Sequence, residues 1–145
     1  MKRTTLLQFI MILLTVLALT SIAAASGRTF TTTLTGAAEV PPGDPDGTGT
    51  ATITFMPGAG QVCWEIQVSG ITLPATASHI HEAPAGVAGP VVIPLSAPDA
   101  NGFSSGCASV AREQILEIMR DPEGYYVNVH NVDYPSGALR GQLSK

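Results

Sequence analysis

The stretch QVCWEIQVS, from Gln61 to Ser69, alternates apolar and polar residues with a period of two. Successive side chains of a β-strand point to opposite faces, so this alternation predicts a strand that lays one face on a hydrophobic core. The residues on that face are Val62, Trp64, Ile66 and Val68. Cys63 belongs to the other set and is expected on the outward face.

Runs of similar character lie on both sides of this strand, separated by clusters rich in Gly, Pro and Ser. They are TFTTTL (29–34), TATITFM (50–56), ASHIHE (77–82), FSSGCASV (103–110), YYVNVH (125–130) and ALRGQL (138–143). Many short strands with turn signals between them are typical of β-sandwiches and β-barrels. The sequence therefore predicts an all-β domain.

One segment has the periodicity of a helix instead. In VAREQILEIMRDP (110–122), the apolar residues Ile115, Ile118 and Met119 fall on one stripe. Pro122 is expected to end the helix, because the residue before a proline is disfavoured in helical geometry. We expect one short helix beside the strands.

The N-terminus has the pattern of a secretory signal peptide. Lys2 and Arg3 precede an apolar run from Leu6 to Leu19, and small residues follow. This pattern predicts a signal peptide over residues 1–25 and a mature domain over residues 26–145. The alternative is an uncleaved anchor, although the run is shorter than the roughly 20 residues that cross a bilayer. The protein is thus expected to be secreted, periplasmic or on the cell surface, without a membrane span after cleavage.

The charge of the mature chain restricts its partners. Cleavage removes two of the seven basic residues, which leaves five Lys and Arg against eleven Asp and Glu, a formal charge of about −6. Nucleic acids and anionic membranes are bound through basic patches, so neither is expected as a partner. The partners that remain are an unidentified extracellular protein or a metal ion.

The chain has two cysteines, Cys63 and Cys107. Disulfides persist outside the cytoplasm, so export favours a bridge between them. In the chain-entropy model, such a bridge would stabilise the fold by about 4 kcal/mol, because it closes a loop in the unfolded chain. Two separate buried thiols are the alternative.

Three histidines are candidate metal ligands. In ASHIHE, Ile80 is expected in the core, which places His79 and His81 together on the opposite, outer face. In YYVNVH, Val129 is expected in the core, so His130 also faces outward. If the two strands are neighbours, three imidazoles converge, and neutral imidazoles bind copper and zinc. Solvent-exposed histidines without a metal are the alternative.

Three segments, in the same order as in the family, resemble the CHRD domain. They are LTGAAEVPP (34–42), ASHIHEAPAGVAGPVV (77–92) and GYYVNVHNVDYPSGALRGQL (124–143). The resemblance covers nearly all of the mature chain. It implies a single domain with an immunoglobulin-like Greek-key β-sandwich or barrel, distantly similar to copper/zinc superoxide dismutase.

The similarity to dismutase implies roles for individual residues. His79, His81 and His130 would be copper ligands, and Arg140 would steer anions. A strand-surface arginine paired with a carboxylate is the alternative for Arg140. The chain has only three histidines, so it lacks the bridging imidazolate and the zinc ligands of a dismutase.

Three carboxylates remain to be placed. Glu82 and Asp133 either orient an imidazole through its second nitrogen or are loop charges. Glu39, in EVPP, is expected as a strand-end carboxylate.

Together these features predict a secreted, non-catalytic binding module with a three-histidine copper site. A copper-dependent, dismutase-like redox enzyme is the alternative.

Overall fold

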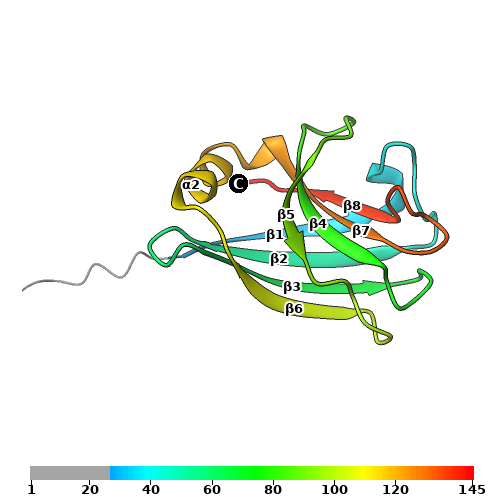
Figure 1. The fold of residues 1–145 in the computed structure, drawn as a ribbon. Helices are drawn as coiled ribbons and strands as arrows, with labels where there is room; N and C mark the ends of the chain where they lie inside the picture. The colour runs from blue at the N-terminus through cyan, green and yellow to red at the C-terminus, as the bar shows by residue number, and fades with distance from the viewer. Residues whose placement is uncertain (1–26) are drawn as a thin grey trace, which may run out of the picture.

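The structure, a computed structural model, describes residues 27–145 (Figure 1). The signal peptide that the sequence predicts over residues 1–25 lies outside the described residues. Within residues 27–145, no helix is both long enough and apolar enough to span a membrane.

The described chain forms eight strands and one α-helix, and the all-β prediction is confirmed. The strands are β1 (Arg28–Thr35), β2 (Thr48–Met56), β3 (Gln61–Ser69), β4 (Ala77–Glu82), β5 (Val91–Leu95), β6 (Phe103–Ser109), β7 (Tyr125–His130) and β8 (Leu139–Gln142). The helix is α2 (Arg112–Arg120), and the 3₁₀ turns are η2 (Gly36–Ala38) and η3 (Pro122–Gly124).

All strand pairs are antiparallel, and the strands follow the order β5-β4-β7-β8-β1-β2-β3-β6. The connections β3–β4, β5–β6 and β6–β7 join strands that are not neighbours in this order, as in a Greek key. In Figure 1 the strands β1, β2, β3 and β6 form one layer, and β4, β5, β7 and β8 cross above it. The sheet thereby encloses a core as a nearly closed barrel or sandwich.

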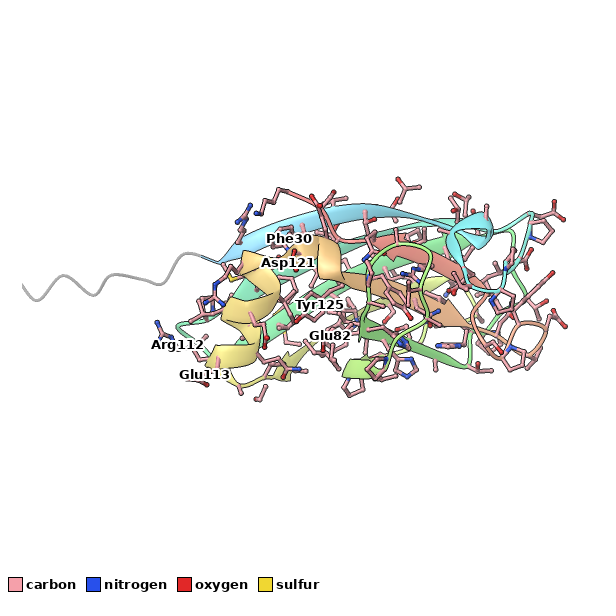
Figure 2. The ribbon with its side chains drawn as sticks, turned by 90° about the horizontal axis from the view of Figure 1, so that it is seen from above. Phe30, Glu82, Arg112, Glu113, Asp121 and Tyr125 are labelled. Carbon is pink, nitrogen blue, oxygen red and sulfur yellow. A yellow bond between two sulfur atoms is a disulfide. The ribbon has the colours of Figure 1, made fainter. Side chains whose placement is uncertain are left out.

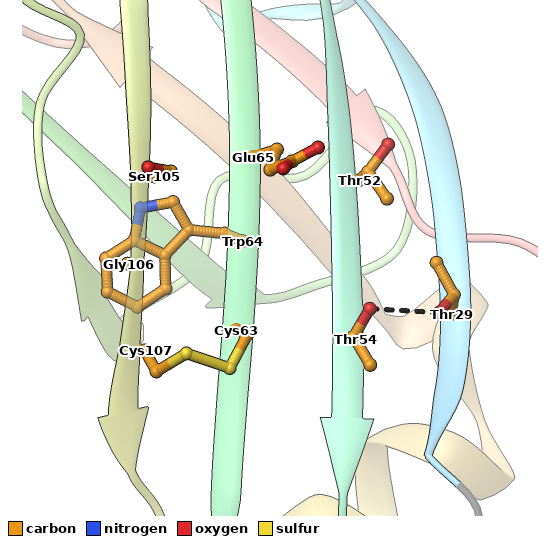
Figure 3. A pocket seen from close by; sticks show the side chains of 9 residues that line it. All are labelled: Thr29, Thr52, Thr54, Cys63, Trp64, Glu65, Ser105, Gly106 and Cys107. Carbon is orange, nitrogen blue, oxygen red and sulfur yellow. Dashed lines mark hydrogen bonds between the residues drawn. A yellow bond between two sulfur atoms is a disulfide. The ribbon is translucent and has the colours of Figure 1, made fainter.

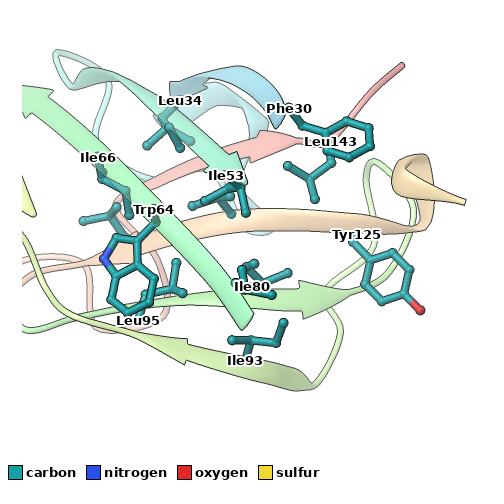
Figure 4. Packing of buried hydrophobic residues seen from close by; sticks show 14 of the residues in the cluster. Phe30, Leu34, Ile53, Trp64, Ile66, Ile80, Ile93, Leu95, Tyr125 and Leu143 are labelled. Atoms are coloured by element: carbon teal, nitrogen blue, oxygen red, sulfur yellow. The ribbon is translucent and has the colours of Figure 1, made fainter. Parts of the chain in front are cut away.

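Both layers contribute to one core (Figure 4). The residues of β3 that the alternation assigned to the core are all buried. Ile80 of β4 and Ile93 of β5 are buried beneath them. Burying one such side chain stabilises the folded state by roughly 2 kcal/mol. A register that places Ile80 in the core is therefore strongly favoured over one that exposes it.

The helix is found where the sequence predicts it. It ends at Arg120, just before the turn that Pro122 begins. Ile115 and Ile118 are buried and Met119 packs partly against the core, while Arg112 and Glu113 lie on the exposed side (Figure 2). The helix thus covers one end of the barrel.

The strand β5 was not predicted from the sequence. Its sequence, VVIPL, does not alternate and contains Pro94. Proline lacks an N–H and is tolerated on edge strands, and β5 stands at one end of the sheet order. The strand therefore forms because β4 offers it a partner, which local propensity does not reveal.

Cys63 and Cys107 form a disulfide between β3 and β6. The two residues face each other in the strand register. Figure 3 shows the bridge on the outward face, beside Trp64 and Thr54, in a hollow of the barrel surface. The bridge ties β6, the last strand in the sheet order, to its neighbour.

Replacing both cysteines, as in Cys63→Ser/Cys107→Ser, is expected to lower the free energy of unfolding by about 4 kcal/mol, because the unfolded chain regains the entropy of an open loop. Urea denaturation measures the loss. Ser109→Ala, an exposed substitution on β6, is the control and should change stability by less than about 0.5 kcal/mol. A loss below about 1 kcal/mol in the double variant would contradict the prediction.

Candidate metal centre

The pairing of β4 with β7 brings the three histidines together. In this register Ala77 is opposite His130, and His79 is opposite Asn128. Because side chains alternate along both strands, His79, His81 and His130 share the face that points away from the core. One potential ligand atom from each of them lies within 4.8 Å of the other two.

The histidines lie on the face that points away from the core, and two of them are partly exposed, but His81 and the side chains beside it are buried. The exposed fraction of His81 is only 8%, and those of Tyr126 and Asn128 are 3% and 2%. Residues 83–90, which join β4 to β5, bond to side chains of this face. The side chains therefore point outward from the core, and a second layer of chain buries His81 and the side chains beside it.

Two backbone carbonyls determine the tautomers of two imidazoles. His81 Nδ1 lies 2.9 Å from the carbonyl oxygen of Gly89, and His130 Nδ1 lies 3.0 Å from that of Pro135. A carbonyl oxygen only accepts, so both Nδ1 atoms carry the proton. In the neutral rings each Nε2 atom then bears a lone pair. Metal-binding histidines have the same arrangement, in which one ring nitrogen donates a hydrogen bond and the other binds the metal.

The third imidazole bonds to one of these nitrogens. His79 Nδ1 lies 3.2 Å from His130 Nε2. Because the His130 proton is on Nδ1, His79 Nδ1 donates to His130 Nε2. Among residues 27–145, the buried Nε2 atom of His81 finds no hydrogen-bond partner. A buried lone pair without a donor is costly, so His81 is poised to bind a cation.

Burial lowers the pKa of all three histidines. The pKa of His79 is lowered first by desolvation and then by His130 and His81. Desolvation also lowers the pKa of His81, and the hydrogen bond to Gly89 opposes this only in part. Desolvation likewise dominates for His130, against the bond to Pro135. The neutral form, which binds metals, is therefore favoured near pH 7.

The two candidate orienting carboxylates lie elsewhere. Glu82 pairs with Tyr125 at the end of β4, on the face opposite His81, and is exposed (Figure 2). Asp133 is exposed and accepts a hydrogen bond from the Thr72 hydroxyl. Within residues 27–145, neither carboxylate is hydrogen-bonded to an imidazole. The carbonyls of two covering loops orient the rings instead.

Arg140 is buried, with an exposed fraction of 2%. Its guanidinium donates to the carbonyl oxygens of Val87, at 2.8 Å, and Pro84, at 2.9 Å. It also lies 3.4 Å from the centre of the Tyr126 ring. These donors therefore face the protein's own backbone. This position differs from both alternatives that the sequence suggested, an anion guide and a strand-surface ion pair.

A buried polar pair adjoins the site, which the sequence did not indicate. The Asn128 amide donates to the carboxylate of Glu39, whose exposed fraction is 6%. Burial raises the pKa of Glu39, and the bonds to Asn128 and the charge of Arg140 oppose this. A Cβ atom on Gly137 would lie 2.6 Å from Glu39 Cδ, so only glycine fits over the pair. Glu39 is thus internal and not a strand-end charge.

Comparison with known families finds one match, to a family described as CHRD domain, over residues 30–143. Neither the curated proteins nor the solved structures contain a match to this chain. The match confirms the resemblance drawn from the sequence motifs. The similarity to superoxide dismutase is not shown.

The lowered histidine pKa values predict that the metal-free protein loses stability in acid. Below the unfolded pKa of about 6.5, the unfolded chain takes up protons that the folded protein excludes. The free energy of unfolding should therefore be greatest above that pH and fall as the pH decreases toward the lowered folded pKa values. Urea melts between pH 8 and pH 5, with a chelator present, measure the change.

These are the only histidines of the chain, which allows a matched control. The variant His79→Gln/His81→Gln/His130→Gln should show a flatter dependence between pH 7 and pH 5. An equal dependence in both proteins would show that other groups are responsible.

Proposed function

This chain belongs to the CHRD domain family, and from that premise we propose that it is an extracytoplasmic binding module that holds a copper ion on His79, His81 and His130. The observation that carries the proposal is the convergence of one ligand atom from each imidazole within 4.8 Å. The fixed tautomers of His81 and His130 support it, because they leave Nε2 lone pairs for a cation.

The spacing of the nitrogen atoms fits a metal ion. Two nitrogens bound to one tetrahedral ion at 2.0–2.1 Å are about 3.3 Å apart. His79 Nδ1 and His130 Nε2 are 3.2 Å apart. An ion would thus replace the shared proton, which would move to the other nitrogen of His79. A separation of 4.8 Å, the upper limit among the three ligand atoms, would need to shorten by about 1.5 Å.

Copper is the ion that this set of ligands favours. Imidazole suits copper and zinc, and copper binds more tightly than zinc in the order of divalent metals. Burial keeps the three rings neutral, so no proton has to be removed before binding. A bound copper ion would supply one-electron chemistry, while the protein positions the ligands and shields His81 from water.

Export is part of the proposal. The first 25 residues have the signal-peptide pattern, and the Cys63–Cys107 disulfide would persist outside the cytoplasm. The acidic charge of the mature chain also agrees with a partner other than nucleic acid. The partner would be a metal ion, with or without an extracellular protein.

A copper-dependent redox enzyme is the second candidate. The same imidazoles would suit it, but guiding superoxide to the copper, as in a dismutase, would call for a cationic group that is free to meet an anion. Arg140 is buried and donates to Val87 and Pro84. A non-catalytic binding module is therefore better supported. A superoxide assay on the copper-loaded protein distinguishes the two.

Calorimetric titration of the purified protein with copper and with zinc is expected to show one tight copper site per chain. His79→Ala/His81→Ala should abolish this binding, because a single imidazole remains. Glu82→Gln/Asp133→Asn is the matched control, since it neutralises two exposed carboxylates that form no hydrogen bond with the imidazoles within residues 27–145. It should bind copper within twofold of the parent protein. Equal binding by the histidine variant and the parent would refute the site.

A further inference from the structure

The loop formed by residues 83–90 is held against the candidate metal centre by side chains from two strands, β7 and β8. Arg140 and Gln142 of β8 donate to the carbonyls of Pro84, Val87 and Ala83. The N–H of Gly89 donates to the Tyr126 hydroxyl of β7 at 3.1 Å. We refer to residues 83–90 as the covering loop.

The covering loop contacts the candidate metal centre through Gly89. The Gly89 carbonyl accepts from His81 Nδ1, so it fixes the tautomer and the direction of the His81 ring. A Cβ atom on Gly89 would lie 2.0 Å from the carbonyl oxygen of Glu82, so the backbone here approaches β4 too closely for any other residue. The position of the ligand thus depends on how the loop is anchored.

Arg140 provides the central anchor. It donates to two carbonyls three residues apart in the covering loop, one from each terminal nitrogen of the planar guanidinium, and the single nitrogen of an ammonium lacks this fixed spacing. Its own orientation is set by the Tyr126 ring, 3.4 Å away, and by the Gln142 side chain. Tyr126 stacks in turn on His81, with ring centres 4.8 Å apart and planes 11° apart.

We propose that Arg140 is a positioning residue of the metal centre, which acts through the covering loop and the Tyr126 ring to orient His81. This inference rests on the proposed function. It assigns the buried guanidinium to the protein's own backbone and not to an anionic substrate. A charged group that is buried and hydrogen-bonded to carbonyls stabilises one arrangement of the loop, because any other leaves the charge unpaired.

Arg140→Lys tests the proposal, because lysine keeps the charge but loses the two-carbonyl geometry. Loss of such an outer partner typically weakens metal affinity by about 10–100-fold, and we expect a loss in this range for copper, measured by calorimetry. Hydrogen exchange of the amides in residues 83–90 should become faster at the same time. A folded Arg140→Lys protein with faster exchange and unchanged copper affinity would overturn the proposal.

Tyr126→Phe is the second variant, in case the buried arginine cannot be replaced without unfolding. It keeps the aromatic stack and removes only the hydroxyl that anchors Gly89. We expect a smaller loss of copper affinity, of about 3–10-fold, because one neutral hydrogen bond is removed. Unchanged affinity in this variant would also contradict a role for the covering loop.

Gln114→Ala is the matched control. Gln114 of α2 donates to the carbonyl of Val92, which lies just beyond the covering loop. Removing this bond should leave copper affinity within twofold of the parent, and an equal loss here would show a general structural effect. If the parent protein binds no copper, the proposed function fails. If the parent binds and Arg140→Lys binds equally well, only the present inference fails.

Discussion

The antiparallel register between β4 and β7 is the constraint on which the rest of the site depends. It places Ile80 opposite Val127 in the core and His79 opposite Asn128 on the other face. A slip of one residue would turn the imidazoles into the core and expose Ile80. The loss of buried apolar surface would strongly destabilise the fold. The hydrophobic core therefore determines where the histidines stand, although none of them belongs to it.

A second layer then converts an ordinary strand face into a polar interior. The covering loop and the segment around Pro135 lie over side chains that would otherwise be hydrated, and they supply carbonyls to His81 and His130. Burial alone would make these rings costly. Burial combined with a carbonyl that binds Nδ1 of His81 and of His130 instead leaves an Nε2 lone pair on each of these two rings, as in sites where a second partner orients a metal ligand.

Much of the fold follows from the period of the apolar residues. The alternation in β3 and the stripe in α2 predicted both elements, and the same reasoning placed the three histidines on one face. The strand β5 was missed, because its pairing with β4 is a tertiary effect. The covering layer was also missed, since loops have no periodicity. Arg140 is a similar case, because a buried arginine is rare and only its partners explain it.

The most direct test of the account is the tautomeric state of the imidazoles in the metal-free protein. Long-range ¹⁵N–¹H NMR above pH 7.5 distinguishes protonated from unprotonated ring nitrogens. If the carbonyls of Gly89 and Pro135 orient the rings, His81 and His130 carry their proton on Nδ1, with Nε2 unprotonated. Protons on Nε2 of these residues, or rapid averaging between the two nitrogens, would show that the carbonyls of Gly89 and Pro135 do not orient the rings and would contradict the account.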